Sequence, residues 1–438
     1  MIAQIAFVFL LATASFFIFK RFRFVKRNIL LGRDTEISGS SRERWSTMFR
    51  VALGQGKMFT RPFAAFLHLI VYAGFIIINI EVLEILIDGL FGTHRVFAGL
   101  GGLYTFLIAS FEILAFLVLA ACVVLLIRRN AGAVKRLAMP ELNGWPRNDA
   151  NLILIAEVLL MTAFITMNAC DYQLNQIIDK SGAHTYISDA AFPISSLWSA
   201  VVEGSSVQSL HMIERFCWWF HIIGMLSFIV YLSYSKHLHI LLAFPNTYYS
   251  KLLAPGALSN LQSVTNEVKL MLDPSAQVPP PPEGPQRFGV KDVQDLSWVN
   301  LMNAYSCTEC GRCTSECPAN QTGKLLSPRK IMMDTRDRLE EVGRCMDKNN
   351  GLWQDDGKSL LRDYITEEEL WACTSCNACT QACPININPL EIIIDLRRYL
   401  IMEESKSPES ITVMFNNIEN NGAPWAMSAM DRDQWRNN

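Results

Sequence analysis

Five long apolar segments constrain the fold of this 438-residue chain more than any other feature of its sequence. Each has roughly the 20 mainly apolar residues that a helix needs to cross a bilayer. A segment inside a bilayer must pair its own backbone polar groups, so the pattern predicts five transmembrane helices. The first, IAQIAFVFLLATASFFIF, lacks both a preceding basic residue and a following cleavage site, which favours a retained helix over a signal peptide. The segments are 2–19, 62–86, 103–127, 151–168 and 207–235.

The basic residues between these segments predict their orientation. Residues 20–61 carry eleven Lys or Arg and residues 128–147 carry five, whereas 87–102 has only Arg95 and 169–206 only Lys180. By the positive-inside rule the two basic loops face the cytoplasm. We therefore expect a multi-pass protein of the cytoplasmic (inner) membrane, with its N-terminus outside and everything after the fifth helix in the cytoplasm.

The composition changes to a soluble type after residue 240. The formal net charge of -2 gives no indication of nucleic-acid binding. PSAQVPPPPEGP, at 274–285, is typical of a stiff polyproline spacer. Helical spacing in LLSPRKIMMDTRDRLEEVG and NPLEIIIDLRRYLIMEE predicts a mostly helical soluble part. We expect a membrane domain at 1–245, a linker at 246–285, a helical domain at 286–404 and a tail at 405–438.

Eight of the twelve cysteines form two copies of the pattern C-x2-C-x2-C-x3-C-P. This spacing is typical of paired [4Fe–4S] clusters, in which the fourth cysteine of each run ligates the other cluster. Zinc sites more often pair two C-x2-C hooks, and a cytoplasmic location disfavours disulfides. The predicted ligand sets are therefore crosswise: Cys307, Cys310, Cys313 and Cys383 for the first cluster, and Cys373, Cys376, Cys379 and Cys317 for the second. Cys345 lies between the two copies and receives no role.

Histidines in the apolar half are candidate haem ligands. Helix two offers His68, and the region of helix five offers His221 and His239. On one continuous helix the latter two would share a face about 27 Å apart, so they cannot serve the same haem. His237 would point away from that face, which favours a position near lipid headgroups. Spacing leaves open which residue pairs with His68, whereas coupling of a haem to cytoplasmic clusters favours His239. A second haem would need a less usual ligand such as Met58 or His94.

Carboxylates inside the apolar segments are the other unusual feature. Glu112 and Glu157 lie well within their segments, and Glu81 and Glu84 lie towards the end of the second. Intramembrane carboxylates are costly and often mark proton paths, as quinone chemistry requires. Exposure at the membrane interface is an equally good interpretation for Glu81 and Glu84.

Several of these stretches together resemble a known family. RFCWWFHIIGMLSFIVYLSYSKHLHILLAFPN (215–246) resembles the last helix of the nitrate reductase gamma-type cytochrome b, especially in its fusions with heterodisulfide reductase-like iron–sulfur proteins. DLSWVNLMNAYSCTECGRCTSECPA and ITEEELWACTSCNACTQACPI are similar to the iron–sulfur segment of those fusions. The fusions include membrane-bound electron-transfer-flavoprotein:quinone oxidoreductases.

The resemblance implies an all-α fold, with a five-helix transmembrane cytochrome b-like bundle followed by a helical 2x[4Fe-4S] ferredoxin-like domain. It places the eight motif cysteines as cluster ligands and His68, His221 and His239 at haem positions. The family pattern has a second histidine on helix two where this chain has Ile78, so one haem b is expected and a second stays open. Full-length fusions continue into CCG repeats, whereas this chain has no Cys-Cys pair. We therefore expect a separate CCG-domain iron–sulfur subunit docked on the tail, where Trp425 and Trp435 are candidate anchors.

Two functions of different class fit these features. The first is an electron-transfer subunit that passes electrons between a cytoplasmic flavoprotein or CCG-type partner and menaquinone or ubiquinone. The second is a membrane-anchored ferredoxin that reduces a metal or thiol during assembly of a respiratory complex. Because the sequence shows no G-x-G-x-x-G after a strand, no P-loop and no nucleophile constellation, no catalytic residue is assigned. The assembly function has no use for three histidines on helices two and five, so bound haem distinguishes the two.

Overall fold

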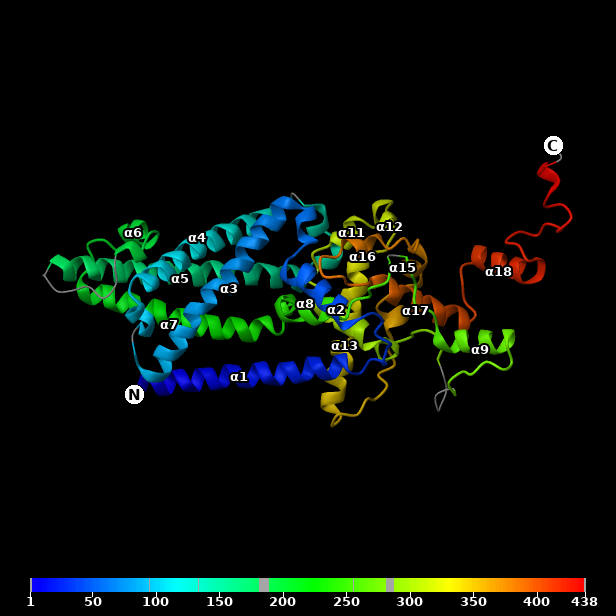
Figure 1. Ribbon diagram of the computed structural model, residues 1–438, viewed down its shortest axis with the longest axis horizontal. Helices are drawn as coiled ribbons and strands as arrows, with labels where there is room; N and C mark the ends of the chain where they lie inside the picture. Colours follow the sequence, from blue (N-terminus) through cyan, green and yellow to red (C-terminus); the bar gives the residue numbers. More distant parts are fainter. Residues whose placement is uncertain are drawn as a thin grey trace. The chain divides into compact units, whose positions relative to one another are not determined.

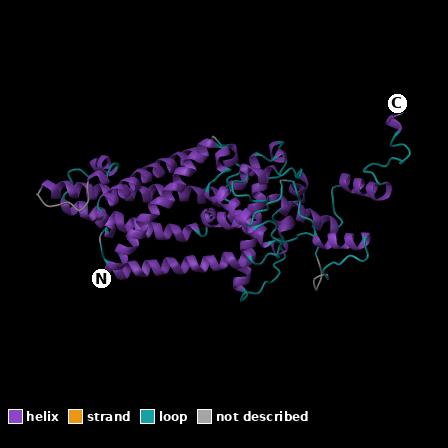
Figure 2. Ribbon diagram, in the orientation of Figure 1, coloured by secondary structure: helices purple, strands orange, loops and turns teal. Residues whose placement is uncertain are grey.

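The computed structural model describes residues 2–93, 95–132, 134–180, 189–254, 256–280 and 287–436. His94 and most of the polyproline spacer lie outside these residues. Within them the chain forms helices and loops with only isolated β-bridges, which confirms the expected all-α fold (Figure 2). The chain divides into two compact units. The first comprises Met1–Lys26, Met48–Phe244 and Thr308–Cys310, and the second comprises Arg27–Thr47, Pro245–Cys307 and Gly311–Asn438.

The five apolar segments all form long helices, as predicted. Each helix is long and apolar enough to cross a membrane by its length and composition. In Figure 1 they lie side by side. They are α1 (Ile2–Ile29), α3 (Pro62–Phe91), α4 (Gly102–Asn130), α5 (Trp145–Lys180) and α7 (Val207–Leu232).

α5 is the central helix of the first unit, where it packs against α4 and α7. Ile108, Phe164 and Phe228 belong to the apolar core that these three helices share. A second core joins α1 to α3 and α7 around Phe7. Phe7 approaches α3 so closely that a Cβ at Gly89 would lie 2.5 Å from its ring, so only glycine fits there. Small residues at such contacts allow close helix packing, which is the usual way of packing helices in a membrane.

The predicted continuous helix through His239 is wrong. α7 ends at Leu232, and a short 3-10 turn, η8 (Lys236–Leu238), precedes α8 (His239–Tyr248). Ser235 is extended and its hydroxyl accepts a hydrogen bond from the His237 N–H, which starts the new turn. His221 and His239 therefore do not lie on one face of one helix.

The second unit is built around α13 (Pro328–Lys348), which packs on α10 (Trp298–Ser306) and α17 (Pro389–Met402). The fully buried Arg338 of α13 forms ion pairs with Asp292 at 2.7 Å and Asp356 at 2.6 Å. Helix α9 (Gln262–Leu272) lies in the expected linker and α18 (Glu409–Asn421) in the expected tail. The other α-helices are short: α2 (Ser41–Met48), α6 (Ser195–Trp198), α11 (Arg312–Ser315), α12 (Pro318–Gln321), α14 (Leu360–Asp363), α15 (Glu367–Ala372) and α16 (Ala378–Ala382).

Candidate metal centres

The two cysteine motifs fold into loops of the same backbone conformation. Glu309 and Gly311 in the first motif have φ angles of 56° and 69°, and Ser375 and Asn377 in the second have 54° and 61°. Each loop is followed by a short helix, α11 or α16. Left-handed residues within such loops turn successive backbone N–H groups toward a common centre, which favours a bound anionic group. The duplication in sequence is therefore also a duplication in backbone structure.

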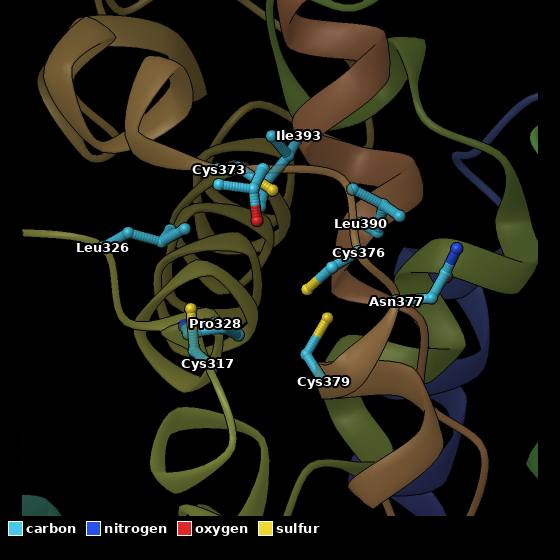
Figure 3. Close-up of a pocket in the computed structure, with 10 residues that line it drawn as sticks. Cys317, Leu326, Pro328, Cys373, Cys376, Asn377, Cys379, Leu390 and Ile393 are labelled. Carbon is cyan, nitrogen blue, oxygen red and sulfur yellow. The ribbon is translucent and has the colours of Figure 1, made fainter. Parts of the chain in front are cut away.

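Four cysteines of the second unit line one pocket (Figure 3). Cys373, Cys376 and Cys379 come from the second motif and Cys317 from the first, because α11 and α16 are in contact. This is the set that the crosswise assignment predicted for the second cluster. The thiols surround the pocket, and among the described residues no three Cys, His, Asp or Glu side chains converge as ligands of one metal ion. Apolar side chains complete the wall: Leu326, Pro328, Leu390 and Ile393.

The surroundings of these thiols match the needs of an iron–sulfur cluster. Burial raises the pKa of the Cys379 thiol to about 12 and raises that of Cys373 as well. Such thiols lose their protons when a positively charged metal compensates the buried thiolates. The N–H of Ser375 already donates to the Cys373 sulfur at 3.4 Å. The Arg397 guanidinium donates to the Leu370 carbonyl at 3.0 Å, which fixes the end of α15 before Cys373.

The other four motif cysteines are divided between the two units. Cys310 belongs to the first unit, whereas Cys307, Cys313 and Cys383 belong to the second. Cys383 accepts a hydrogen bond from the Ile387 N–H at 3.3 Å. The ligand set of the first cluster stays a prediction.

All three predicted haem histidines use Nδ1 in a hydrogen bond to an oxygen atom. The distances are 3.1 Å from His68 to Gln55 Oε1, and 3.2 Å from both His221 to the Leu160 carbonyl and His239 to the Lys236 carbonyl. An oxygen acceptor requires the proton to lie on Nδ1, so Nε2 keeps the lone pair in the neutral ring. Metal-binding histidines are commonly oriented by such a second hydrogen bond. In this tautomer Nε2 is the ring nitrogen that would ligate a metal.

His68 is an electrostatic neighbour of His239, whereas His221 packs beside α5. Burial, together with the neighbouring His68 imidazole, lowers the pKa of His239 to about 4, so its ring is neutral at physiological pH, as a ligand must be. His221 instead packs beside α5, with its ring centroid 6.1 Å from that of Phe164.

His237 was missed as a member of this group. Its ring centroid lies 5.3 Å from that of His239, and burial, followed by the charges of His239, His68 and Lys236, lowers its pKa well below the usual value. Its Nδ1 is buried without a hydrogen-bond partner. The directions predicted for the side chains of His237 and His239 assumed that one helix continues through both residues. The chain turns after Leu232, so that assumption was wrong. The pattern His-x-His at 237–239 was the sequence signal that could have indicated a histidine cluster.

Two of the four intramembrane carboxylates act as hydrogen-bond acceptors for loops. Glu112 accepts from the backbone N–H groups of Ile194 at 3.0 Å and Ser195 at 3.1 Å. Glu84 accepts from the Phe97 N–H at 2.9 Å. Both are therefore explained by the anchoring of interhelical loops. Glu81 differs, since its Oε2 atom is buried and has no hydrogen-bond partner.

Comparison with known proteins agrees with this arrangement of cysteines. Residues 306–387 match the 4Fe-4S dicluster domain family. The probable iron-sulfur-binding oxidoreductase FadF of Bacillus subtilis is 28% identical to the chain and covers 93% of it. The EtfAB:quinone oxidoreductase of Syntrophomonas wolfei is 25% identical and covers 98%. The chain spans 57% and 59% of the lengths of these two relatives.

A third relative matches only a quarter of the chain. It is one of the subunits of the ferredoxin/F(420)H(2)-dependent CoB-CoM heterodisulfide reductase of Methanosarcina acetivorans, and it is 33% identical over 25% of this chain and 53% of its own length. No solved structure matches the chain significantly. The homologues are thus iron–sulfur oxidoreductases and heterodisulfide reductase subunits, the group that the sequence resembles.

Proposed function

We propose that this protein is a membrane-bound electron-transfer subunit. Its homologues are iron–sulfur oxidoreductases of the heterodisulfide reductase group. In this proposal electrons pass between a cytoplasmic flavoprotein or CCG-type partner and the quinone pool, through two [4Fe–4S] clusters and haem b. The observation that carries it is the pocket lined by Cys317, Cys373, Cys376 and Cys379. When bound, clusters and haem supply one-electron carriers, and the protein holds them in place.

Haem b is the finer part of the proposal. His68 and His239 are the pair that the geometry favours, because they lie near one another and both present Nε2 for ligation. His221 is prepared in the same way but packs on α5, so it would serve a separate haem. The quinone, menaquinone or ubiquinone, is proposed by analogy with a relative that is a quinone oxidoreductase.

The partners and the orientation in the membrane are further parts of the proposal. Several homologues are subunits of heterodisulfide reductases, which supports the presence of partner subunits. A CCG-domain iron–sulfur subunit and a cytoplasmic flavoprotein are the partners expected from the family resemblance. The basic loops favour a cytoplasmic position for the iron–sulfur domain.

Metal and haem analysis of the purified membrane protein tests the proposal. We expect about eight irons per chain as two cubane clusters, together with a haem b signal in the pyridine haemochrome spectrum. Two zinc ions and no EPR signal after reduction would contradict the iron–sulfur part. Clusters without any haem would instead favour the membrane-anchored ferredoxin that acts in complex assembly.

A further inference from the structure

We propose that Lys236 is a positioning residue that joins the first cysteine loop to the segment carrying His239, and that its charge pair with Glu309 sets the reduction potential of the cluster bound by Cys310. This inference rests on the proposed function, since it requires a cluster at the first motif. All four residues belong to the first unit.

The buried ammonium group of Lys236 donates hydrogen bonds to two oxygen acceptors and has a second carboxylate within ion-pair distance. It forms an ion pair with the Glu309 carboxylate, donates to the Pro146 carbonyl at 2.6 Å and lies 3.8 Å from Asp149. The side chains of Lys236 and Glu309 are only 7% and 3% exposed. Glu309 lies between Cys307 and Cys310, so the pair fastens the loop that presents Cys310.

The backbone of Lys236 fastens the histidine segment at the same time. Its carbonyl accepts the Nδ1 hydrogen bond of His239 at 3.2 Å, and its N–H donates to Asp149 at 3.3 Å. A second cation, Arg136, donates to the Cys310 carbonyl at 3.0 Å. One lysine therefore contacts both a neighbour of a predicted cluster ligand and a predicted haem ligand.

A buried ion pair of this kind needs an explanation other than stability. Taking two charges out of water costs about as much as their attraction returns, and apolar residues of similar size are often at least as stable. Charge near an iron–sulfur cluster, by contrast, directly shifts its reduction potential. The second motif has Ser375 at the position equivalent to Glu309, with the same left-handed backbone but no charge. The pair would thus act on the first cluster alone.

A redox titration followed by EPR tests this inference. The test is the direction in which each of two variants shifts the reduction potential of the first cluster. The signal that disappears in Cys310→Ser identifies the first cluster. Lys236→Met removes the positive charge beside the Glu309 carboxylate, so the potential of the first cluster should fall. Glu309→Gln removes the negative charge beside the Lys236 ammonium, so the potential should rise. The double variant should return close to the wild-type potential, and the second cluster should not shift in any of the three.

If the Lys236–Glu309 pair only held the loop in place, the result would be different. Loosening of the loop would move both single variants in the same direction or broaden both signals, and either outcome, or no shift at all, would overturn the inference. Lys358→Met and Glu341→Gln are controls, because this pair, at 2.7 Å, is 50% and 32% exposed, so that solvent screens its charges and the first cluster should be unchanged. Wild-type protein without clusters would contradict the proposed function instead.

Discussion

The backbone N–H of Ser375 donates a hydrogen bond to the sulfur of Cys373 at 3.4 Å. Ser375 holds this position with a φ of 54°, in the left-handed region that a side chain disfavours by roughly 1 kcal/mol. Ser375→Gly should therefore keep the second cluster and stabilise the loop by up to about 1 kcal/mol. Ser375→Pro removes the N–H and fixes φ near −65°, so it should lose about half of the iron. Iron content and thermal unfolding measure both effects, and full iron in the proline variant would contradict the argument.

Cys317 should behave as a member of the second motif although it lies in the first. The pocket brings it to Cys373, Cys376 and Cys379. Cys317→Ser and Cys376→Ser should therefore remove the same EPR signal and retain the other. Cys313→Ser, the matched change within the first motif, should remove the signal that those two variants keep. Loss of one common signal in Cys313→Ser and Cys317→Ser would show that each motif binds its own cluster.

His68 and His239 are expected to ligate one low-spin haem. Replacement of either by Ala should abolish the same low-spin spectrum, because both axial positions are needed. Gln55→Leu removes the acceptor of the His68 Nδ1 hydrogen bond and should weaken haem binding by roughly 10- to 100-fold. His211→Ala, at an exposed histidine of α7, is the control, and its haem spectrum should persist. An unchanged spectrum in His68→Ala would place the ligands elsewhere.

Asp356 should contribute stability that depends on pH. Its hydrogen bond from Arg338 lowers its pKa below the usual value. A carboxyl group of this kind contributes fully above its unfolded pKa of about 4, and the contribution is lost as the pH falls through the lower folded pKa. Asp356→Asn should therefore unfold at a lower temperature than wild type near pH 7, with a difference that shrinks below about pH 4. Thermal unfolding of the full chain across this range provides the measurement, and a constant difference would contradict the assignment.

The tail is expected to bind the proposed CCG-type subunit. α18 exposes Val413 and Ile418, and Trp425 and Trp435 are 56% and 76% exposed. Aromatic residues dominate interface energetics, so deletion of 410–438 should release the partner from membranes and leave haem and cluster spectra intact. Met271→Ser on α9 changes an equally exposed apolar side chain and should have no effect. A native pull-down that recovers the chain alone, with full quinone reductase activity, would disprove this role.

The sequence by itself determined the five long apolar helices, and it predicted the ligand type of the clusters. A bilayer leaves a spanning segment of this length no alternative to helix, so length and apolar content were sufficient. The cysteine spacing was equally informative, because a cubane cluster needs three thiolates from one short loop and a fourth from elsewhere. Spacing also predicted that Cys317 lies with the cysteines of the second motif, as it does in the pocket lining.

Only the tertiary structure decided how the histidines are grouped. The sequence placed His221, His237 and His239 by the geometry of one continuous helix, whereas the chain turns after Leu232 and begins a new helix at His239. That turn depends on Asp149, far away in the sequence, which accepts the Lys236 N–H. The role of Lys236 was invisible for the same reason, since Glu309 lies 73 positions further along the chain. Periodicity reports local structure, and contacts between distant segments arise only when the helices pack.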